Sequence, residues 1–411
     1  MHNEKSVTAA LPKTTPSRTR TAAVVFAGFC AFTTLFAPQP LLPLLARAFA
    51  VTPGRASLLV TASTLAVAMA APFAGIVADR LGRKRVIAPA AFLLAIPTLL
   101  AATASSFGQL LFWRFLQGVF TPGIFAVVIA YVNEEWEHGA GAATAAYVTG
   151  TVLGGFSGRV LAASVAASFG WRWAFVALGI VNLLGAAAIQ AWLPPGHKFL
   201  RARRHNPLGA MLRHLRNPRL AATYVVGFCV MFTLLGTFTY VNFYLAAPPF
   251  SMSTAALGRL FVVYLVGAII TPRAGRMIDR MGHRFALVAA FTVGAAGVAL
   301  TLAHSMTAVL AGLTLACTGV FVANSAGSSY VGSAATESRA SAVGLYVTFY
   351  YVGGSAGSAI PGLIWSHPEW GACVALIVAV QALTIVLAAL FWKPLPRAAG
   401  PAPLTAAIEE G

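Results

Sequence analysis

Long apolar stretches follow one another through most of the chain, and each stops at a cluster of glycine, proline or charged residues. A helix needs about 20 apolar residues to cross a bilayer. The chain is 58% hydrophobic and 9% charged, whereas about a quarter of a soluble domain is charged. The sequence therefore predicts an all-α integral membrane protein. Twelve spans are expected, at residues 21–46, 57–78, 86–104, 109–132, 141–167, 172–193, 220–246, 254–278, 286–303, 308–331, 340–365 and 371–392.

The positive charge is unevenly distributed over this topology. Of the 28 Lys and Arg residues, 21 fall in segments on one side of the membrane, and loops rich in Lys and Arg remain in the cytoplasm. We therefore place both termini in the cytoplasm, and assign the charge of +18 to orientation, not to nucleic-acid binding. A cleaved signal peptide is the competing interpretation of the first apolar stretch, but that stretch is too long and further spans follow it.

These assignments divide the chain into five parts. The central linker opens on Pro194-Pro195-Gly196 and carries seven basic residues and no acid. Residues 208–215 within it favour a short amphipathic helix, whose basic face either binds anionic lipid headgroups or serves only as an orientation signal. The parts are a cytoplasmic tail (1–20), a six-helix bundle (21–193), the linker (194–219), a second six-helix bundle (220–392) and a second tail (393–411).

One charged motif occurs twice. Residues 75–85 read Gly-Ile-Val-Ala-Asp-Arg-Leu-Gly-Arg-Lys-Arg, and residues 275–284 repeat the spacing of the glycines, the Asp and the first Arg. Other short motifs recur at offsets of 199 to 201, including Tyr147-Val148-Thr149 as Tyr346-Val347-Thr348. Two parallel repeats that enclose a site at their interface are a transporter architecture.

Three motifs of the first half resemble the signatures of the major facilitator superfamily. They are the run 75–85, Arg114-x-x-Gln117-Gly118, and the glycine-rich run from Gly150 to Arg159. Within that superfamily, Pro38-Gln39-Pro40-Leu41-Leu42-Pro43 and residues 154–159 and 350–354 are similar to the bacterial inner-membrane permeases called YnfM-like or arabinose-efflux-like. The resemblance implies two pseudo-symmetric six-helix bundles and transport by alternating access.

The repeated motif predicts contacts at the cytoplasmic ends of the helices. Gly75 allows a partner helix to approach closely, and the Asp79 carboxylate favours a helix N-terminus, where the dipole is positive. The resemblance implies that Asp79 docks near Ser341 and Asp279 near Gly141, and that Arg83 pairs with an acid of the loop after residue 132. The gating residues expected are Gly75, Asp79, Arg80, Gly82, Arg83, Glu134, Glu135, Gly275, Asp279, Arg280, Gly282 and His283.

The second copy departs from the first. His283 replaces the basic residue Arg83 and is mostly neutral near pH 7, and the loop after residue 331 offers only Glu337. We expect the first copy to form the tighter latch. The alternative is that these charges serve only to orient the helices in the membrane.

Two arginines fall inside predicted spans, where ionisable groups are costly and face a cavity or a partner. Arg114 and Arg159 both lie in the periplasmic half, and Gln117 shares a helical face with Arg114. None of the ten acids lies inside a span, so the two arginines lack a carboxylate and the usual proton carrier is missing. Either an anionic substrate or neighbouring helices with backbone carbonyls and tyrosines satisfy them, and proton coupling is in doubt.

The second half offers tyrosines in place of charge. Side chains of this kind suit a partly apolar ligand with a few hydrogen-bonding groups, although interface-belt or packing tyrosines are the alternative. The substrate-binding residues expected are Arg114, Gln117, Arg159, Tyr147, Gln39, Tyr240, Asn242, Tyr244, Tyr346 and Tyr350.

The sequence thus predicts a bacterial inner-membrane secondary transporter that functions as a monomer in the lipid bilayer. Export of a small organic compound, drug-like or sugar-like, is the leading function by resemblance, and uptake or exchange of a small organic anion is the alternative. A non-transporting receptor on the same fold is a third candidate. No phosphate-binding loop or metal-ligand cluster is present in the sequence, so we expect no enzymatic activity, no cofactor and no metal, with a coupling proton as the remaining candidate partner.

Overall fold

The computed structural model describes residues 18–136, 139–194, 207–335, 337–365 and 370–392. Residues 1–17 and 393–411 of the predicted tails, and residues 195–206 of the predicted linker, lie outside these ranges. Within the described ranges all regular secondary structure is helical. The first half contains α1 (Arg18–Leu35), η1 (Gln39–Leu41), α2 (Leu42–Ala48), α3 (Pro53–Leu81), α4 (Lys84–Ala101), α5 (Phe107–Phe120), α6 (Pro122–Glu135), α7 (Ala140–Phe169) and α8 (Trp171–Trp192).

The second half repeats this succession after a short helix. The amphipathic helix expected at 208–215 is present as α9. The elements are α9 (Pro207–Arg216), α10 (Pro218–Ala246), α11 (Thr254–Leu260), α12 (Val263–Met281), α13 (His283–Leu300), α14 (Met306–Ala334), α15 (Arg339–Ala359), η2 (Ile360–Leu363) and α16 (Trp370–Phe391).

Ten spans within the described ranges are long and apolar enough to cross a membrane. The other two of the twelve predicted spans are α11 with α12, whose second part carries the charges of the repeated motif, and α15 with η2, which is rich in glycine, serine and tyrosine. The fold is therefore the predicted all-α, twelve-span membrane architecture.

Four of the spans are interrupted. The first interruption is at Pro38-Gln39-Pro40, where α1 ends at Leu35 and the chain passes through η1 into α2. Interruptions at Pro122 and Pro361, and between α11 and α12, were not predicted. Proline lacks the N–H that continues a helical ladder, which accounts for those at Pro122 and Pro361.

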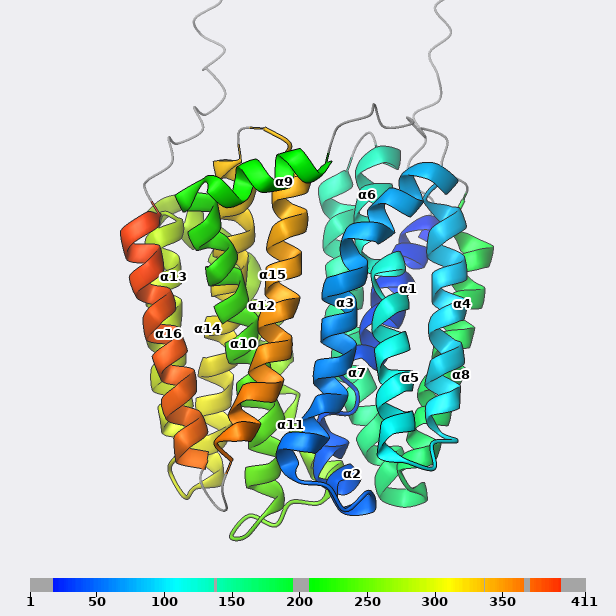
Figure 1. Cartoon of the computed structure of the whole chain (residues 1–411), viewed down its shortest axis with the longest axis vertical. Helices are drawn as coiled ribbons and strands as arrows, with labels where there is room; N and C mark the ends of the chain where they lie inside the picture. Colours follow the sequence, from blue (N-terminus) through cyan, green and yellow to red (C-terminus); the bar gives the residue numbers. More distant parts are fainter. Residues whose placement is uncertain (1–17, 137–138, 195–206, 336, 366–369, 393–411) are drawn as a thin grey trace, which may run out of the picture.

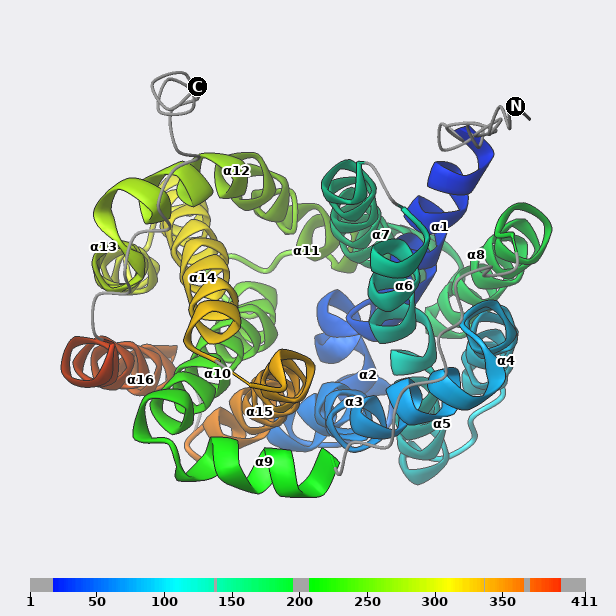
Figure 2. The ribbon, with the colours of Figure 1, turned by 90° about the horizontal axis from the view of Figure 1, so that it is seen from above.

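The helices form two bundles that stand side by side (Figures 1 and 2), α1–α8 and α10–α16. The start of α1 and the end of α16 lie at the same end of the bundles as α9, and we call this end the terminal side. The segments α2 and α11 lie at the other end, the opposite side, where they approach the neighbouring bundle.

The two bundles share one packing arrangement. A Cβ added at Gly154 or Gly158 of α7 would collide with the carbonyl of Phe29 or Thr33 of α1. The same collisions occur 199 residues later, between Gly353 or Gly357 of α15 and the carbonyls of Phe228 and Phe232 of α10. Small residues allow helix backbones to approach this closely in a membrane. The glycine runs therefore serve helix packing in both halves.

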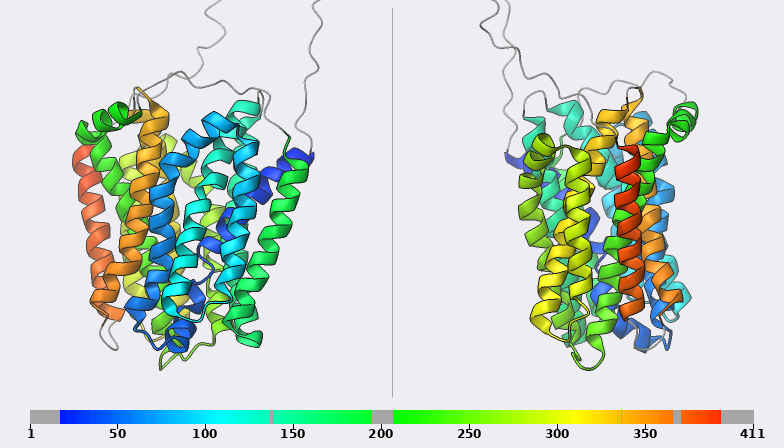
Figure 3. Two further views of the ribbon diagram at one scale, coloured as in Figure 1. Left: turned by 45° about the vertical axis from the view of Figure 1, so that its right-hand side comes forward. Right: turned by 90° about the vertical axis from the view of Figure 1, so that its left-hand side faces the viewer.

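Contacts between the two bundles run along α3 and α15, which lie side by side (Figure 3), and between α7 and α11. Towards the opposite side, Thr61 Oγ1 lies 2.9 Å from Ser358 Oγ, and Thr64 Oγ1 lies 2.9 Å from Ser355 Oγ. A Cβ at Gly54 would reach the Gly362 carbonyl at 2.8 Å. Towards the terminal side, a Cβ at Gly75, Gly141, Gly275 or Gly344 would have no atom within 4 Å. The bundles are therefore closed together at the opposite side and apart at the terminal side.

Candidate functional site

The first copy of the repeated motif holds an ion-pair cluster at the terminal side. Arg83 donates to Glu134 from Nε at 3.0 Å and from Nη2 at 2.5 Å, and its Nη1 lies 2.6 Å from Asp79 Oδ1. Burial of Arg83 lowers the pKa of its guanidinium, but the Glu134 and Asp79 carboxylates outweigh this and raise it. The cluster joins the end of α3, the start of α4 and the end of α6. The pairing expected between Arg83 and an acid after residue 132 is therefore present.

Glu135 has a different partner from Glu134. Its Oε2 lies 3.3 Å from Arg20 Nη2, and the Arg20 guanidinium stacks 3.9 Å from the centre of the Trp136 ring. Glu135 thus ties α6 to the start of α1. Arg80 is exposed to its surroundings.

The second copy is more weakly connected. His283 Nε2 lies 3.1 Å from Ser329 Oγ, and the His283 ring meets the Tyr330 ring edge-on at 5.7 Å. Asp279 and Arg280 are exposed, and Asp279 makes no ion pair within the described part of the chain. Gly82 and Gly282 occupy the same turn in both copies, with φ of 93° and 86°, a region that favours glycine.

The two contacts that the resemblance implies at the terminal side are not formed as hydrogen bonds or ion pairs in the described part of the chain. The Asp79 carboxylate pairs with Arg83 of its own motif, and no hydrogen bond or ion pair joins it to Ser341 or joins Asp279 to Gly141. Gly75 and Gly275 face open space, in keeping with bundles that are apart at the terminal side.

Arg114 lies wholly inside the first bundle with 0% of its surface exposed. Its guanidinium donates to the carbonyls of Leu59 (3.1 Å), Thr34 (3.0 Å) and Leu35 (2.6 Å), to Ser63 Oγ (2.8 Å), and to Gln117 Oε1. Five N–H donors thus meet five acceptors. Thr34 and Leu35 are the last residues of α1, whose carbonyls have no helical partner. Arg114 therefore caps the broken first span, and Gln117 supports it.

Arg159 lies between the bundles and has no carboxylate partner in the part of the chain that the structure describes. Its Nε and Nη2 donate to Gln39 Oε1 at 2.9 and 2.7 Å, and its Nη1 donates to the Gly155 carbonyl at 2.7 Å. The guanidinium lies over the rings of Phe36, Phe261 and Tyr264, at 5.1, 4.6 and 4.7 Å from their centres. Two of its five donors have no oxygen partner among the described residues. Arg159 and Gln39 are thus brought together, as a cation held by a neutral amide and aromatic faces.

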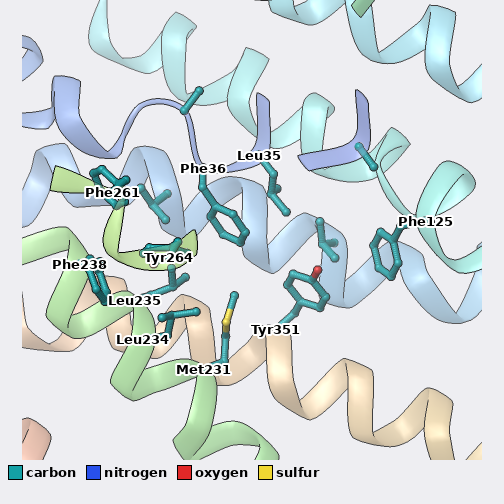
Figure 4. Close-up of a cluster of buried hydrophobic side chains, with 14 of the residues drawn as sticks. Leu35, Phe36, Phe125, Met231, Leu234, Leu235, Phe238, Phe261, Tyr264 and Tyr351 are labelled. Carbon is teal, nitrogen blue, oxygen red and sulfur yellow. The ribbon is translucent and has the colours of Figure 1, made fainter. Parts of the chain in front are cut away.

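Apolar and aromatic side chains from both bundles meet in one cluster (Figure 4), which includes the three rings that lie against Arg159. Phe36 and Phe125 come from the first bundle; Met231, Phe261, Tyr264 and Tyr351 come from the second. The Phe125 and Tyr351 rings lie 5.7 Å apart across the interface, and Tyr264 stands edge-on to Phe238 at 4.7 Å. We call this set the interbundle aromatic cluster.

The predicted tyrosines divide into two groups. Tyr346 and Tyr350 stack at 6.2 Å on α15, and Tyr350 meets Tyr351 of the cluster at 5.6 Å. Tyr147 is 5% exposed and donates to the Phe125 carbonyl at 3.4 Å. These three residues adjoin the interbundle aromatic cluster.

The residues predicted on α10 are not part of that group. The Tyr240 hydroxyl donates to the Ser358 carbonyl at 2.8 Å and lies 3.0 Å from Ser57 Oγ, which joins the bundles near the opposite side. Asn242 donates to the Phe238 carbonyl of its own helix at 2.5 Å. Tyr244 stacks on Trp370 at 5.8 Å.

Sequence reasoning missed most of the interbundle aromatic cluster. Phe36, Phe125, Met231, Phe261 and Tyr264 belong to types that are common throughout apolar spans, and the chain contains 27 Phe residues. The usable signal was position: Phe36 precedes the Pro38 break, and Phe261 and Tyr264 flank the α11–α12 interruption.

Two pseudo-symmetric helical bundles around a mixed aromatic and cationic interface define a multi-pass membrane transporter. The family description "Major Facilitator Superfamily" matches residues 24–335 and, in a second match, residues 242–409. The chain belongs to the major facilitator superfamily.

Relatives of known sequence are transporters of the same family. The chain is 31% identical over 371 residues to the inner membrane transport protein YnfM of Escherichia coli, covering 88% of each chain. It is 32% identical over 354 residues to the uncharacterized MFS-type transporter YybF of Bacillus subtilis, covering 85% of this chain and 88% of that one. A bacterial homolog of the human lysosomal transporter Spinster, in an inward-facing and occupied conformation, superposes with a TM-score of 0.73 at 16% identity, over 90% of this chain and 95% of that one.

Proposed function

We propose that this transporter exports a small, partly apolar organic compound by alternating access. The observation that carries the proposal is the interbundle aromatic cluster. Both bundles contribute to it, and it lies between the opposite side, where the bundles are closed together, and the terminal side, where they are apart. Aromatic and aliphatic walls with few polar groups suit a drug-like or sugar-like ligand. The export direction rests on the similarity of the motifs at residues 38–43 and 154–159 to efflux-type permeases.

The proposed setting is the bacterial inner membrane, with the terminal side in the cytoplasm. The basic residues at the motif ends, in α9 and beside both termini support this orientation. In that frame the present arrangement is open to the cytoplasm. A single chain contains both bundles and the whole cluster, which supports function as a monomer.

We assign gating to the terminal-side contacts. Closing the bundles there would bring the ends of α3 and α15 together around Gly75, whose surroundings are empty in the present arrangement. The cluster of Arg83, Asp79 and Glu134 would keep the first bundle's ends in one rigid unit during that movement. We place Tyr147, Tyr346 and Tyr350 beside the substrate and assign Arg114, Gln117, Tyr240, Asn242 and Tyr244 to structural support.

A second candidate is uptake or exchange of a small organic anion. Arg159 favours it, because a buried cation with only neutral partners gains most from an anionic ligand. An aryl carboxylate would offer an anion for Arg159 and a ring for Phe261 and Tyr264.

Transport measurements separate the two candidates. Purified protein in liposomes with an imposed pH gradient is tested with ethidium, a neutral aryl glycoside and benzoate, while flux and proton movement are recorded. Export predicts that the proton gradient drives ethidium or the aryl glycoside across the membrane, away from the side that the terminal side of the protein faces. Benzoate exchange that ignores the proton gradient would replace the export proposal with the second candidate, and Arg159→Gln would then abolish it.

A further inference from the structure

The helix α9 lies across the terminal-side ends of α10 and α15 (Figures 1 and 3). Its inner face is anchored: Met211 packs against the apolar group that includes Leu220, Tyr224 and Tyr346. His214 is only 7% exposed. The helix is thus held at a fixed height, where the spans of the second bundle end.

The outer face of α9 combines apolar and cationic side chains. Leu212 and Leu215 are 55% and 43% exposed, one helical turn apart. Arg213 and Arg216 are exposed beside them. A helix with this composition, lying at the level where membrane spans end, places its leucines among acyl chains and its arginines among headgroups.

Three arginines lie around a shallow, open pocket on the surface at the corner between α9 and α10. It is lined by Arg213, Arg216, Asn217, Pro218 and Arg219. None of the three guanidinium groups forms an ion pair or donates a hydrogen bond within the described part of the chain. The lining contains no acid. Three unpaired cations around one hollow would repel each other unless an anion occupied it.

An adjacent, smaller pocket limits the possible ligand. It holds about 150 Å³ and is lined by Arg213, His214, Asn217, Leu220, Ala334 and Glu337. The Glu337 carboxylate would repel an anion there, so the anion belongs to the larger, outer pocket. Leu212 and Leu215 are exposed on the same helix, next along the chain to Arg213 and Arg216.

We propose that this corner binds the phosphate of an anionic phospholipid. Arg213, Arg216 and Arg219 hold the phosphate oxygens, for which the planar guanidinium is well matched. Leu212 and Leu215 contact the acyl chains of the same leaflet. A soluble phosphate would leave these leucines in water, which is why the lipid is the occupant favoured. The bound lipid would secure α9 against α10 and α15, the two second-bundle helices that it touches.

Native mass spectrometry of the full-length protein tests this proposal. The protein is released from phosphatidylethanolamine membranes that contain phosphatidylglycerol as the probe, and the phosphatidylglycerol that stays bound is measured. The variant R213Q/R216Q/R219Q is compared with the matched control R85Q/R276Q/R284Q, which removes three exposed arginines from the same side. We expect the first variant to lose retained phosphatidylglycerol by at least about tenfold, because basic residues near an anionic surface each add to the attraction for its lipids, and the control to retain it. Equal losses would overturn the proposal in favour of diffuse charge attraction, and retention by both would overturn it outright.

Two further arms distinguish the source of the phosphate and guard against misfolding. The variant L212S/L215S keeps all charges and should weaken lipid retention. Undiminished retention by this variant would show a site for a soluble anion instead. Full displacement of the lipid from the wild type by inorganic phosphate at constant ionic strength would show the same. R213K/R216K/R219K keeps the charge but loses the planar donor pair. We expect it to fold like the wild type and to retain an intermediate amount of lipid, and wild-type retention would refute guanidinium recognition.

Discussion

The structural role of Arg114 gives the sharpest prediction. Arg114→Ala removes five hydrogen bonds at once and leaves the carbonyls of Thr34 and Leu35, at the end of α1, without their partner inside the first bundle. Hydrogen bonds from a charged donor contribute about 1.5–3 kcal/mol each, but those of one group are not additive, and removing the buried charge recovers part of its desolvation cost. By analogy with the removal of one partner from a buried ion pair, we expect a net loss of about 3–5 kcal/mol in the free energy of unfolding.

The measurement is unfolding of purified protein in mixed micelles, followed by tryptophan fluorescence. Arg172→Ala is the matched control, because Arg172 donates one hydrogen bond to the Ala104 carbonyl at 3.0 Å and stacks on Trp171 at 4.3 Å. We expect that control to lose about 1–2 kcal/mol. Arg114→Lys retains the charge but has only three donors, so its stability should remain below wild type.

The reasoning would be refuted by an Arg114→Ala protein that unfolds no more easily than Arg172→Ala. That result would mean that the freed carbonyls find other partners, and that Arg114 is available to a ligand after all. Substrate binding by Arg114→Ala under conditions where it is folded separates these roles, since a structural residue leaves the dissociation constant unchanged.

Three further predictions follow from the packing and the ion pairs. Gly158→Ala and Gly357→Ala should each lower the thermal midpoint of unfolding strongly, because the new Cβ collides with the Thr33 or Phe232 carbonyl. Gly108→Ala is the control, since its Cβ meets no atom within 4 Å; equal midpoints for all three variants would contradict the close packing of α1 with α7 and of α10 with α15. Gly75→Leu should leave the thermal midpoint unchanged but slow transport, since the open space beside Gly75 must close for the bundles to meet at the terminal side. A cysteine introduced at the end of α3 should then stay reactive to a thiol reagent throughout the transport cycle; normal transport by Gly75→Leu would argue against this closure. A double-mutant cycle of Arg83→Gln with Glu134→Gln should give a coupling of about 1 kcal/mol that falls with salt, while His283→Gln with Glu337→Gln should give none; equal couplings would remove the asymmetry between the two copies.

The sequence and the structure differ most at the two buried arginines. Both lie within apolar spans without a carboxylate, and from the sequence each was open to the same two interpretations. Arg114 proved to be satisfied by five acceptors within one bundle, and Arg159 to lie between the bundles against Gln39 and three rings. Sequence spacing cannot separate these two cases, because the partners are distant along the chain. Ser63 and Thr34 lie 51 and 80 residues from Arg114, and Gln39 lies 120 residues from Arg159.

The sequence by itself determined the twelve spans and the duplication, and the resemblance of its motifs implied that Arg83 pairs with an acid after residue 132. Backbone hydrogen bonds within a membrane span must be satisfied locally, so length and apolarity are sufficient to define each helix, and the repeated motifs reveal the internal symmetry. Only the tertiary structure decided that Gly75 and Gly275 face open space, that the Asp79 carboxylate pairs with Arg83 of its own motif, and that Phe261 and Tyr264 cover Arg159. These features depend on how the two bundles are inclined toward each other, and that inclination results from contacts between distant segments.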